Sequence, residues 1–263
     1  MCARTRRDVR ARTVAQAPPA YREAMDHTIP FVGCAGWSIP RDDAPRFPAE
    51  GSHLQRYAAV FNAVEINSSF YRPHQPKTYA RWAQDTPDGF RFAVKLPRTI
   101  THEARLRDFD ALLAQFAGEA GALGNKLGVV LVQLPPSLAL DADAARILFE
   151  ALHEAFPCTI ACEARHASWF TDDATQLLCD AAVTRVLADP VVGYRGDFVP
   201  TSEDAYVRLH GSPRIYYSRY TPQQIEDVRA WLVRHPAAWC ILDNTAGGQA
   251  TPNALELHAA LRA

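Results

Sequence analysis

Acidic, basic and imidazole side chains stand at or just behind the ends of short apolar runs in this chain. Glu65, Lys95 and Glu163 each lie at the end of such a run, and His210 follows another. Paired carboxylates and a histidine are groups that often move protons in enzymes near neutral pH. The residues that we expect to carry catalysis are Glu65, Glu163, His210 and Lys95, with a glutamate as base and His210 as acid or base.

A second set of polar and aromatic residues follows the same runs and would bind the substrate. Arginine suits a carboxylate or a phosphate because its guanidinium binds these groups in a two-pronged fork. We expect Arg165 and Arg208, together with Lys95, to hold an anion, while the aromatic members shape the rim of the pocket. The predicted binding residues are Trp37, Asn67, Tyr71, Gln133, Arg165, Trp169, Arg208, Asp243 and Asn244.

The apolar runs would be strands, because helix-like segments separate most of them. Eight strands alternating with helices over about 250 residues are typical of a closed parallel barrel, whose catalytic groups lie where the strands end. Side chains alternate between the two faces of a strand, so Glu163 shares a face with Arg165, and Arg208 shares one with His210. The sequence therefore predicts a single α/β domain, a TIM (β/α)8 barrel with a mixed-charge ring at its mouth. The eight runs are Phe31–Ala35, Ala63–Ile66, Phe90–Val94, Gly128–Val132, Thr159–Cys162, Thr184–Ala188, Ala205–Leu209 and Trp239–Leu242.

Helix signals are clearest in two places. Phe109, Leu112 and Phe116 form one apolar face, and Thr221 with the proline and glutamine after it is a helix start. Thr251-Pro252 repeats that start before the last helix, whereas glycines and prolines between residues 189 and 205 predict a loop in place of the sixth helix. Further helices are expected over about 53–60, 76–85, 143–155 and 172–182.

The composition of the chain indicates where the domain begins and in which compartment we expect the protein. Residues 1–28 are rich in arginine and are expected to be a disordered tail, with an organelle transit peptide as the alternative, and residues 29–263 form the barrel. No apolar stretch is long enough to span a membrane. The six cysteines include no Cys-x-x-Cys pair, so we expect reduced thiols and a cytoplasmic location. The sequence does not indicate an oligomeric state.

Several strings, taken in order, resemble the domain of unknown function 72 family, also called YecE-like proteins. The likeness runs from about residue 31 to the end of the chain, and it implies a TIM barrel but no settled activity. One difference is Leu242-Asp243-Asn244, where many members carry a Phe-Asn-Asn-type string, and this acid changes the charge of the pocket. The strings that carry the resemblance are Gly33–Ser38, Phe61–Tyr71, Phe90–Pro97, Ile100–Glu103, Leu131–Pro136, Glu163–Phe170, Tyr206–Gly211 and Asp243–Thr245.

Four functions fit these residues. We favour an enzyme of hydrolase or lyase type that acts on a small polar or anionic compound in the mixed-charge pocket. A metal-dependent, phosphodiesterase-like barrel would use Glu65, Glu163, His210 and Asp243 as ligands of a divalent ion, but the interleaved cations already balance these acids, so no metal ligand is assigned. A nucleic-acid-binding barrel would use the rim aromatics, and the net charge of −1 disfavours it. A non-catalytic metabolite-binding protein is the remaining alternative.

Overall fold

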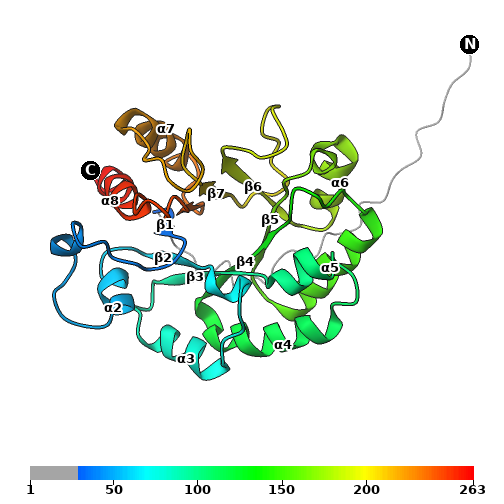
Figure 1. Cartoon of the computed structure of the whole chain (residues 1–263), viewed down its shortest axis with the longest axis horizontal. Helices are drawn as coiled ribbons and strands as arrows, with labels where there is room; N and C mark the ends of the chain where they lie inside the picture. The colour runs from blue at the N-terminus through cyan, green and yellow to red at the C-terminus, as the bar shows by residue number, and fades with distance from the viewer. Residues whose placement is uncertain (1–28) are drawn as a thin grey trace, which may run out of the picture.

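Eight parallel strands form the centre of the molecule, and helices surround them (Figure 1). The computed structural model describes residues 29–263, so the tail predicted for residues 1–28 lies outside the described residues. The strands pair in the order β1-β8-β7-β6-β5-β4-β3-β2, which is the nearly closed TIM barrel that the sequence predicts. Their bounds are β1 Phe31–Cys34, β2 Ala63–Ile66, β3 Arg91–Lys95, β4 Leu127–Gln133, β5 Thr159–Glu163, β6 Thr184–Asp189, β7 Tyr206–Leu209 and β8 Trp239–Leu242.

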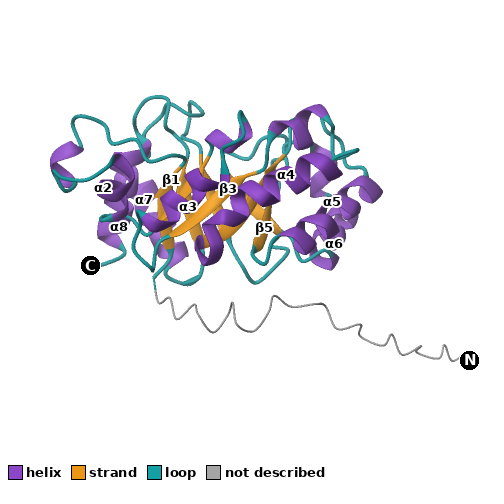
Figure 2. Ribbon diagram, turned by 90° about the horizontal axis from the view of Figure 1, so that it is seen from below, coloured by secondary structure: helices purple, strands orange, loops and turns teal. Residues whose placement is uncertain are grey.

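The strands are short and apolar because both of their faces are buried. Inside the barrel, large rings from the adjacent strands β1, β8 and β7 pack together, and Phe31 stacks on Trp239 with 4.8 Å between ring centroids. The outer faces join a larger core with the helices. Figure 2 shows the strands at the centre with loops projecting from their two ends. This packing leaves the ends of the strands as the places where polar side chains can gather.

The helices begin and end close to where the sequence predicts them. Their bounds are α2 His53–Ala58, α3 Pro76–Gln84, α4 Asp110–Ala120, α5 Ala142–Ala155, α6 Asp172–Asp180, α7 Pro222–Leu232 and α8 Ala250–Ala260. The side chains of Ser52 and Thr221 each complete a capping box, which satisfies free amide groups at the helix start. The last helix starts two residues earlier than Thr251-Pro252 predicts, because Gln249 is the N-cap and α8 begins at Ala250. The Thr251 hydroxyl instead donates to the Ser38 carbonyl at 3.1 Å.

A loop connects β6 to β7, and the described chain has no helix between these two strands, as the sequence predicts. Arg185 holds this loop in place through Nη1, which donates to the carbonyl of Val199 at 2.9 Å. Thr201 fastens the other side, because its hydroxyl donates to the Val183 carbonyl at 2.6 Å and accepts from the Arg185 amide at 2.8 Å. Side chains thus replace the helix that usually covers a barrel at this point.

The seam between β1 and β2 closes through side chains instead of a continuous backbone ladder. The hydroxyl of Tyr57 accepts from the Cys34 amide at 2.7 Å and donates to the Ala63 carbonyl at 3.1 Å. Asn62 accepts from the Val32 amide at 2.8 Å. The two backbones pair where the strands end, at the bridge between Ala35 and Glu65, and there the Gly36 amide donates to the Glu65 carbonyl at 2.9 Å. The seam therefore depends on two buried polar side chains.

Candidate functional site

Ionisable side chains from five of the strand ends meet at the carboxyl mouth of the barrel. Glu65, Lys95 and Glu163 come from β2, β3 and β5, while Arg208 comes from β7 and Asp243 follows β8. All five are buried, with Glu65 and Arg208 fully shielded from solvent. Because parallel strands bring their carboxyl ends to one edge, residues far apart in the sequence become neighbours here. Contacts tie Glu65, Glu163, Arg165, Arg208, His210 and Asp243 into one cluster.

Arg208 is the centre of this cluster. Its Nε donates to Oε2 of Glu65 at 3.0 Å and its Nη2 donates to Oε1 at 2.7 Å, which makes a two-pronged pair. Nη2 also contacts Oδ2 of Asp243 at 2.9 Å, and Nη1 donates to Oε2 of Glu163. Burial alone would lower the pKa of the guanidinium, but the three carboxylates outweigh it and raise the pKa well above its usual value. This arginine is saturated by acids of its own chain, so it has no free fork for an anion.

Arg165 ties the outer oxygen of Glu163 to the rim. Its Nε and Nη2 lie 2.7 and 2.6 Å from Oε1 of Glu163, and its Nη1 donates to the hydroxyl of Tyr216 at 3.2 Å. Burial would raise the pKa of Glu163, but Arg208, His210 and Arg165 hold it well below its usual range. Glu163 is therefore a poor proton acceptor near neutral pH. The side chain of Arg165 is 12% exposed, whereas that of Arg208 is fully buried.

His210 is held between two carboxylates. Its Nδ1 lies 3.0 Å from Oδ2 of Asp243, and its Nε2 lies 3.3 Å from Oε1 of Glu163 without making a hydrogen bond. Burial opposes protonation of the ring, but the bond to Asp243 and the nearby Glu163 outweigh it and raise the pKa of His210. Burial would raise the pKa of Asp243, but the charge of Arg208 and, to a smaller extent, the hydrogen bond with His210 keep this pKa below its usual value. The raised pKa means that His210 carries a proton over a wider range of pH than a free histidine does.

Lys95 differs from the other cations of the cluster. Its side chain is buried, and its ammonium lies 4.2 Å from the centroid of the Phe70 ring. Within residues 29–263 that ammonium forms neither an ion pair nor a hydrogen bond. Burial, followed by the charge of Arg208, lowers the pKa of Lys95 to about 8, although the carboxylates of the cluster partly oppose this. A fraction of this amine is thus unprotonated near neutral pH.

Replacing Lys95 with methionine is expected to stabilise the fold near pH 7 by up to roughly 3 kcal/mol, the equivalent of the lowered pKa. The unfolded chain binds more protons than the folded one between about pH 8 and pH 10.5, so the stability of the natural protein rises with pH across that window. The advantage of the variant should therefore shrink as the pH rises. Urea unfolding near pH 7 and about pH 10 measures it. The exposed Lys77→Met is the matched control and should change little, whereas a loss of stability in Lys95→Met would contradict this account.

A hollow of about 320 Å³ adjoins the cluster above β1 and β2. Trp37 and Asn67 line it, and Trp37 packs edge-on against Trp82 at 5.0 Å. The amide Nδ2 of Asn67 reaches Oδ1 of Asp243 at 3.5 Å, and its buried Oδ1 has no hydrogen-bond partner among the described residues. Gln133 is buried at the end of β4 and pairs in register with Glu163. These predicted binding residues lie at the mouth.

Three predicted binding residues lie away from the cluster. Trp169 is expected at the rim, but it is fully buried. Its indole Nε1 donates to the Leu138 carbonyl at 3.0 Å. Asn244 is also fully buried, and its Nδ2 donates to the Ser218 carbonyl at 3.0 Å, so it braces a loop. Tyr71 is 72% exposed and points to solvent beyond Phe70. Trp169 and Asn244 hold the walls of the site and do not line it.

Tyr206, Phe70 and Tyr216 belong to the site but are missing from the predicted set. The hydroxyl of Tyr206 donates to Oε2 of Glu65 at 2.9 Å from inside the barrel. Tyr206 lies two residues before Arg208, so strand parity could have identified it. Phe70 ends a short 3-10 helix after β2, and Tyr216 lies in the segment between β7 and α7. Nothing in their spacing indicates that they approach Lys95 and Arg165.

The acids of the cluster are committed to cations of the same chain. Within the described part of the chain, no group of three or more His, Cys, Asp or Glu side chains is arranged to hold a metal ion. Three carboxylates bind Arg208 and Arg165, and Lys95 lies near them without an ion pair. A protonated His210 would therefore leave the cluster with one surplus positive charge. An arrangement with this charge can bind an anion beside a proton donor and a proton acceptor.

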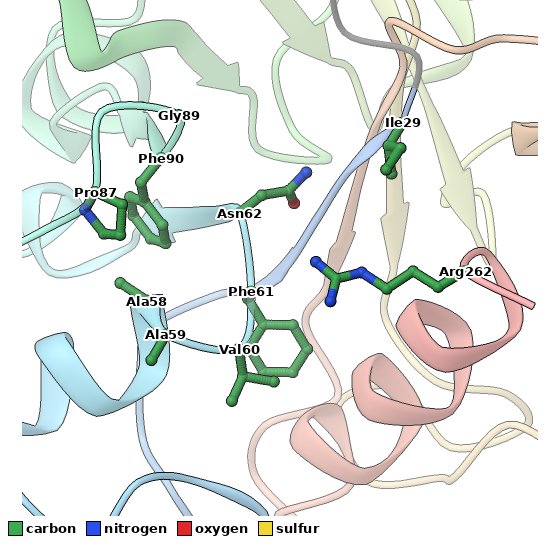
Figure 3. Close-up of a pocket in the computed structure, with 10 residues that line it drawn as sticks. All are labelled: Ile29, Ala58, Ala59, Val60, Phe61, Asn62, Pro87, Gly89, Phe90 and Arg262. Carbon is green, nitrogen blue, oxygen red and sulfur yellow. The ribbon is translucent and has the colours of Figure 1, made fainter.

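A second hollow of about 320 Å³ lies at the opposite, amino end of the barrel (Figure 3). Apolar and backbone groups from residues 58–62 and 87–90 form its wall, and Arg262 is its one ionisable residue within residues 29–263. Ile29, Asn62 and Phe90 lie just before strands, so this end is the one that rarely carries catalysis in barrels of this kind. We assign it no chemical role.

Two further observations concern the environment of the chain. None of the helices in residues 29–263 is long and apolar enough to cross a membrane. The cysteines at 34, 158, 162, 179 and 240 are free thiols, and the predicted location in the cytoplasm stays a prediction.

Comparison with known proteins shows one family. The family described as "Protein of unknown function DUF72" matches residues 31–263. The UPF0759 protein YecE of Escherichia coli (strain K12) is 36% identical over 106 residues, covering 40% of this chain and 37% of YecE, so the match spans little more than a third of that relative. The UPF0759 protein YunF of Bacillus subtilis (strain 168) is 25% identical, covering 86% of this chain and 93% of YunF.

Solved structures agree with the fold. A DUF72 family protein from Thermotoga maritima MSB8 superposes with a TM-score of 0.74 at 25% identity, covering 89% of this chain and all of that one. Another from Enterococcus faecalis V583 has a TM-score of 0.72 at 21% identity, covering 90% of this chain and 98% of that one. The family model, which matches residues 31–263, identifies the family. Because that family is described as one of unknown function, a proposal about chemistry has to be argued from the residues of the site.

Proposed function

Since the chain belongs to the family described as protein of unknown function DUF72, we propose from its site that it is a lyase-type enzyme that transfers protons on a small anionic compound. The observation that carries the proposal is Lys95, a buried amine that has no ion-pair partner among residues 29–263 and lies beside a cluster whose carboxylates bind arginines. A buried cation is costly unless it is used, because its desolvation is not repaid by a counter-ion. An anionic substrate would supply that counter-ion.

The roles follow from which groups remain available. Arg165 binds the anionic group of the substrate, because its side chain is partly exposed whereas that of Arg208 is fully buried. Unprotonated Lys95 accepts a proton, and the imidazolium of His210 donates one through Nε2. Glu65 and Glu163 hold Arg208 in place, so their role is electrostatic. A raised histidine pKa and a lowered lysine pKa bring both groups toward neutrality, where acid–base catalysis is most effective.

Small carboxylates and phosphate esters are expected to raise the melting temperature of the protein and to bind less tightly as the pH rises through the raised pKa of His210. Compounds with a C–H next to a carbonyl should also exchange that hydrogen for deuterium in D₂O, as followed by proton NMR. Lys95→Met should abolish exchange, His210→Gln should remove the pH dependence of binding, and Lys77→Met should behave as the natural protein. Binding without exchange would indicate a metabolite-binding protein, and no binding by any member of the panel would refute the proposal.

A further inference from the structure

The chain contains three lysines, and the structure gives each a different environment. Lys77 is exposed on α3. Lys126 is buried but saturated, because its ammonium donates to the carbonyls of Ala83 and Thr86 and to the Thr86 hydroxyl. Lys95 alone among them combines burial with an ammonium that has no hydrogen-bond acceptor, and an aromatic ring faces it instead. The fold therefore provides acceptors for one buried lysine and withholds them from the other.

The surroundings of Lys95 suit a nucleophilic amine better than a fixed charge. Burial disfavours the protonated amine of Lys95, and the positive charge of Arg208 lowers its pKa further. A lysine becomes a nucleophile when it is desolvated or placed beside another cation, because its free base is then present near neutral pH. The lowering of the pKa from 10.5 to about 8 increases the unprotonated fraction at neutral pH on the order of 100-fold.

Other groups around this nitrogen partly offset the burial and the charge of Arg208. The face of the Phe70 ring lies 4.2 Å from the amine, and an aromatic face attracts an iminium as it attracts an ammonium. The carboxylates of Glu65, Glu163 and Asp243 act on Lys95 from β2, β5 and the end of β8 and favour positive charge there. Arg165 stands at the mouth for an anionic group on the same compound. The ring and the carboxylates would thus lower the cost of a protonated imine at this position.

From this geometry we infer that Lys95 forms a Schiff base with a small aldehyde or ketone that also carries a carboxylate or a phosphate. The free amine adds to the carbonyl carbon, which forms the C–N bond and moves the π electrons onto oxygen. The nitrogen passes a proton to that oxygen, which becomes a hydroxyl. An acid such as His210 then protonates the hydroxyl, and water leaves as the C=N bond of the protonated imine forms. No oxidant or reductant is required. The inference rests on the proposed function and names its substrate class; once Lys95 carries the imine, it no longer accepts a proton but activates the C–H next to the imine carbon.

Trapping with cyanoborohydride tests the inference directly. The protein is incubated with pyruvate, glyoxylate or dihydroxyacetone phosphate, and reduction turns any imine into a stable secondary amine that intact-mass and peptide mass spectrometry locate. The carboxylated and phosphorylated probes distinguish the two kinds of anionic group. We expect the adduct on Lys95, forming roughly 100-fold faster than on Lys77 near pH 7 and faster still as the pH rises to about 8.

Matched variants separate the outcomes. Lys95→Met and Lys95→Arg should give no adduct at that position, and Lys77→Met should give the adduct at the natural rate. Label spread equally over Lys77 and Lys95, or no label on Lys95 with any of the three probes, would overturn the inference. If the probes still raise the melting temperature in that case, the Schiff base alone is refuted. If they neither bind nor label, the proposed function fails with it.

Discussion

Replacing Arg208 with alanine is expected to destabilise the protein by about 3–5 kcal/mol, which lowers its melting temperature by roughly 10 °C. The guanidinium is fully buried and binds three carboxylates from β2, β5 and the end of β8. Its removal leaves like charges facing one another in a region that water does not reach. The cost of those uncompensated charges exceeds the value of the hydrogen bonds themselves. Urea unfolding at neutral pH measures it.

The pH dependence identifies the cause. In the natural protein Arg208 keeps the pKa of Glu163 and that of Asp243 low, so their contribution to stability is present above the pKa values of the unfolded chain and is lost as the pH falls through the folded ones. In Arg208→Ala these acids take up protons at higher pH, and the stability gap should narrow as the pH falls toward about 4. Arg229→Ala, at an exposed helix pair with Glu226, is the control and should leave unfolding unchanged. An Arg208→Ala protein as stable as the natural one would refute the central role of this arginine.

Replacing Gly33 with alanine is expected to cost about 3 kcal/mol, because the new methyl group has no room at the seam between β1 and β2. An added Cβ would lie 2.0 Å from the carbonyl oxygen of Ala63 and 3.0 Å from the hydroxyl of Tyr57. Relief requires the two strands to move apart. That movement breaks the bonds by which Tyr57 joins Cys34 to Ala63, so buried backbone groups lose their partners. Thermal and urea unfolding both report the loss.

Gly118→Ala is the matched control for this substitution. Gly118 lies exposed in α4, and an added Cβ there meets nothing within 4 Å. Alanine is a better helix former than glycine, so this variant should gain about 0.5–1 kcal/mol. The same chemical change is thus expected to act in opposite directions at the two positions. Equal effects at both would show that the seam is not tightly packed.

The arrangement of the strands could be predicted from the sequence because it depends on local patterns. Short apolar runs that are buried on both faces read as strands, and alternation along β5 and β7 correctly placed Arg165 beside Glu163 and His210 beside Arg208 on inward faces. The polar ends of these strands then had to meet, since parallel strands share one carboxyl edge. Geometry of this kind needs no knowledge of distances.

The partners within the cluster could not be predicted, because they depend on distances across the barrel. Spacing permits Glu65 to pair with Lys95 from the neighbouring strand, yet Arg208 reaches across from β7, binds both oxygens of Glu65 and leaves Lys95 alone. Burial of Trp169 depends on how the loop after β5 folds over α5, where its ring lies 6.5 Å from that of Phe149. Neither outcome has a signal in residue type or periodicity.

The position of Arg208 has a consequence for how the protein reaches its native state. Glu65 lies 143 residues before it in the chain, and the other two carboxylates come from separate strands. We expect contacts between such distant residues to form late in folding, because the entropy of closing long loops is lost before the contacts can stabilise the chain. A collapsed chain with one of these strands out of place would keep unpaired charges in its apolar interior. We therefore expect the ion pairs of Arg208 to disfavour misassembled states, because its charge and those of the three carboxylates are paired when all of the strands are in place.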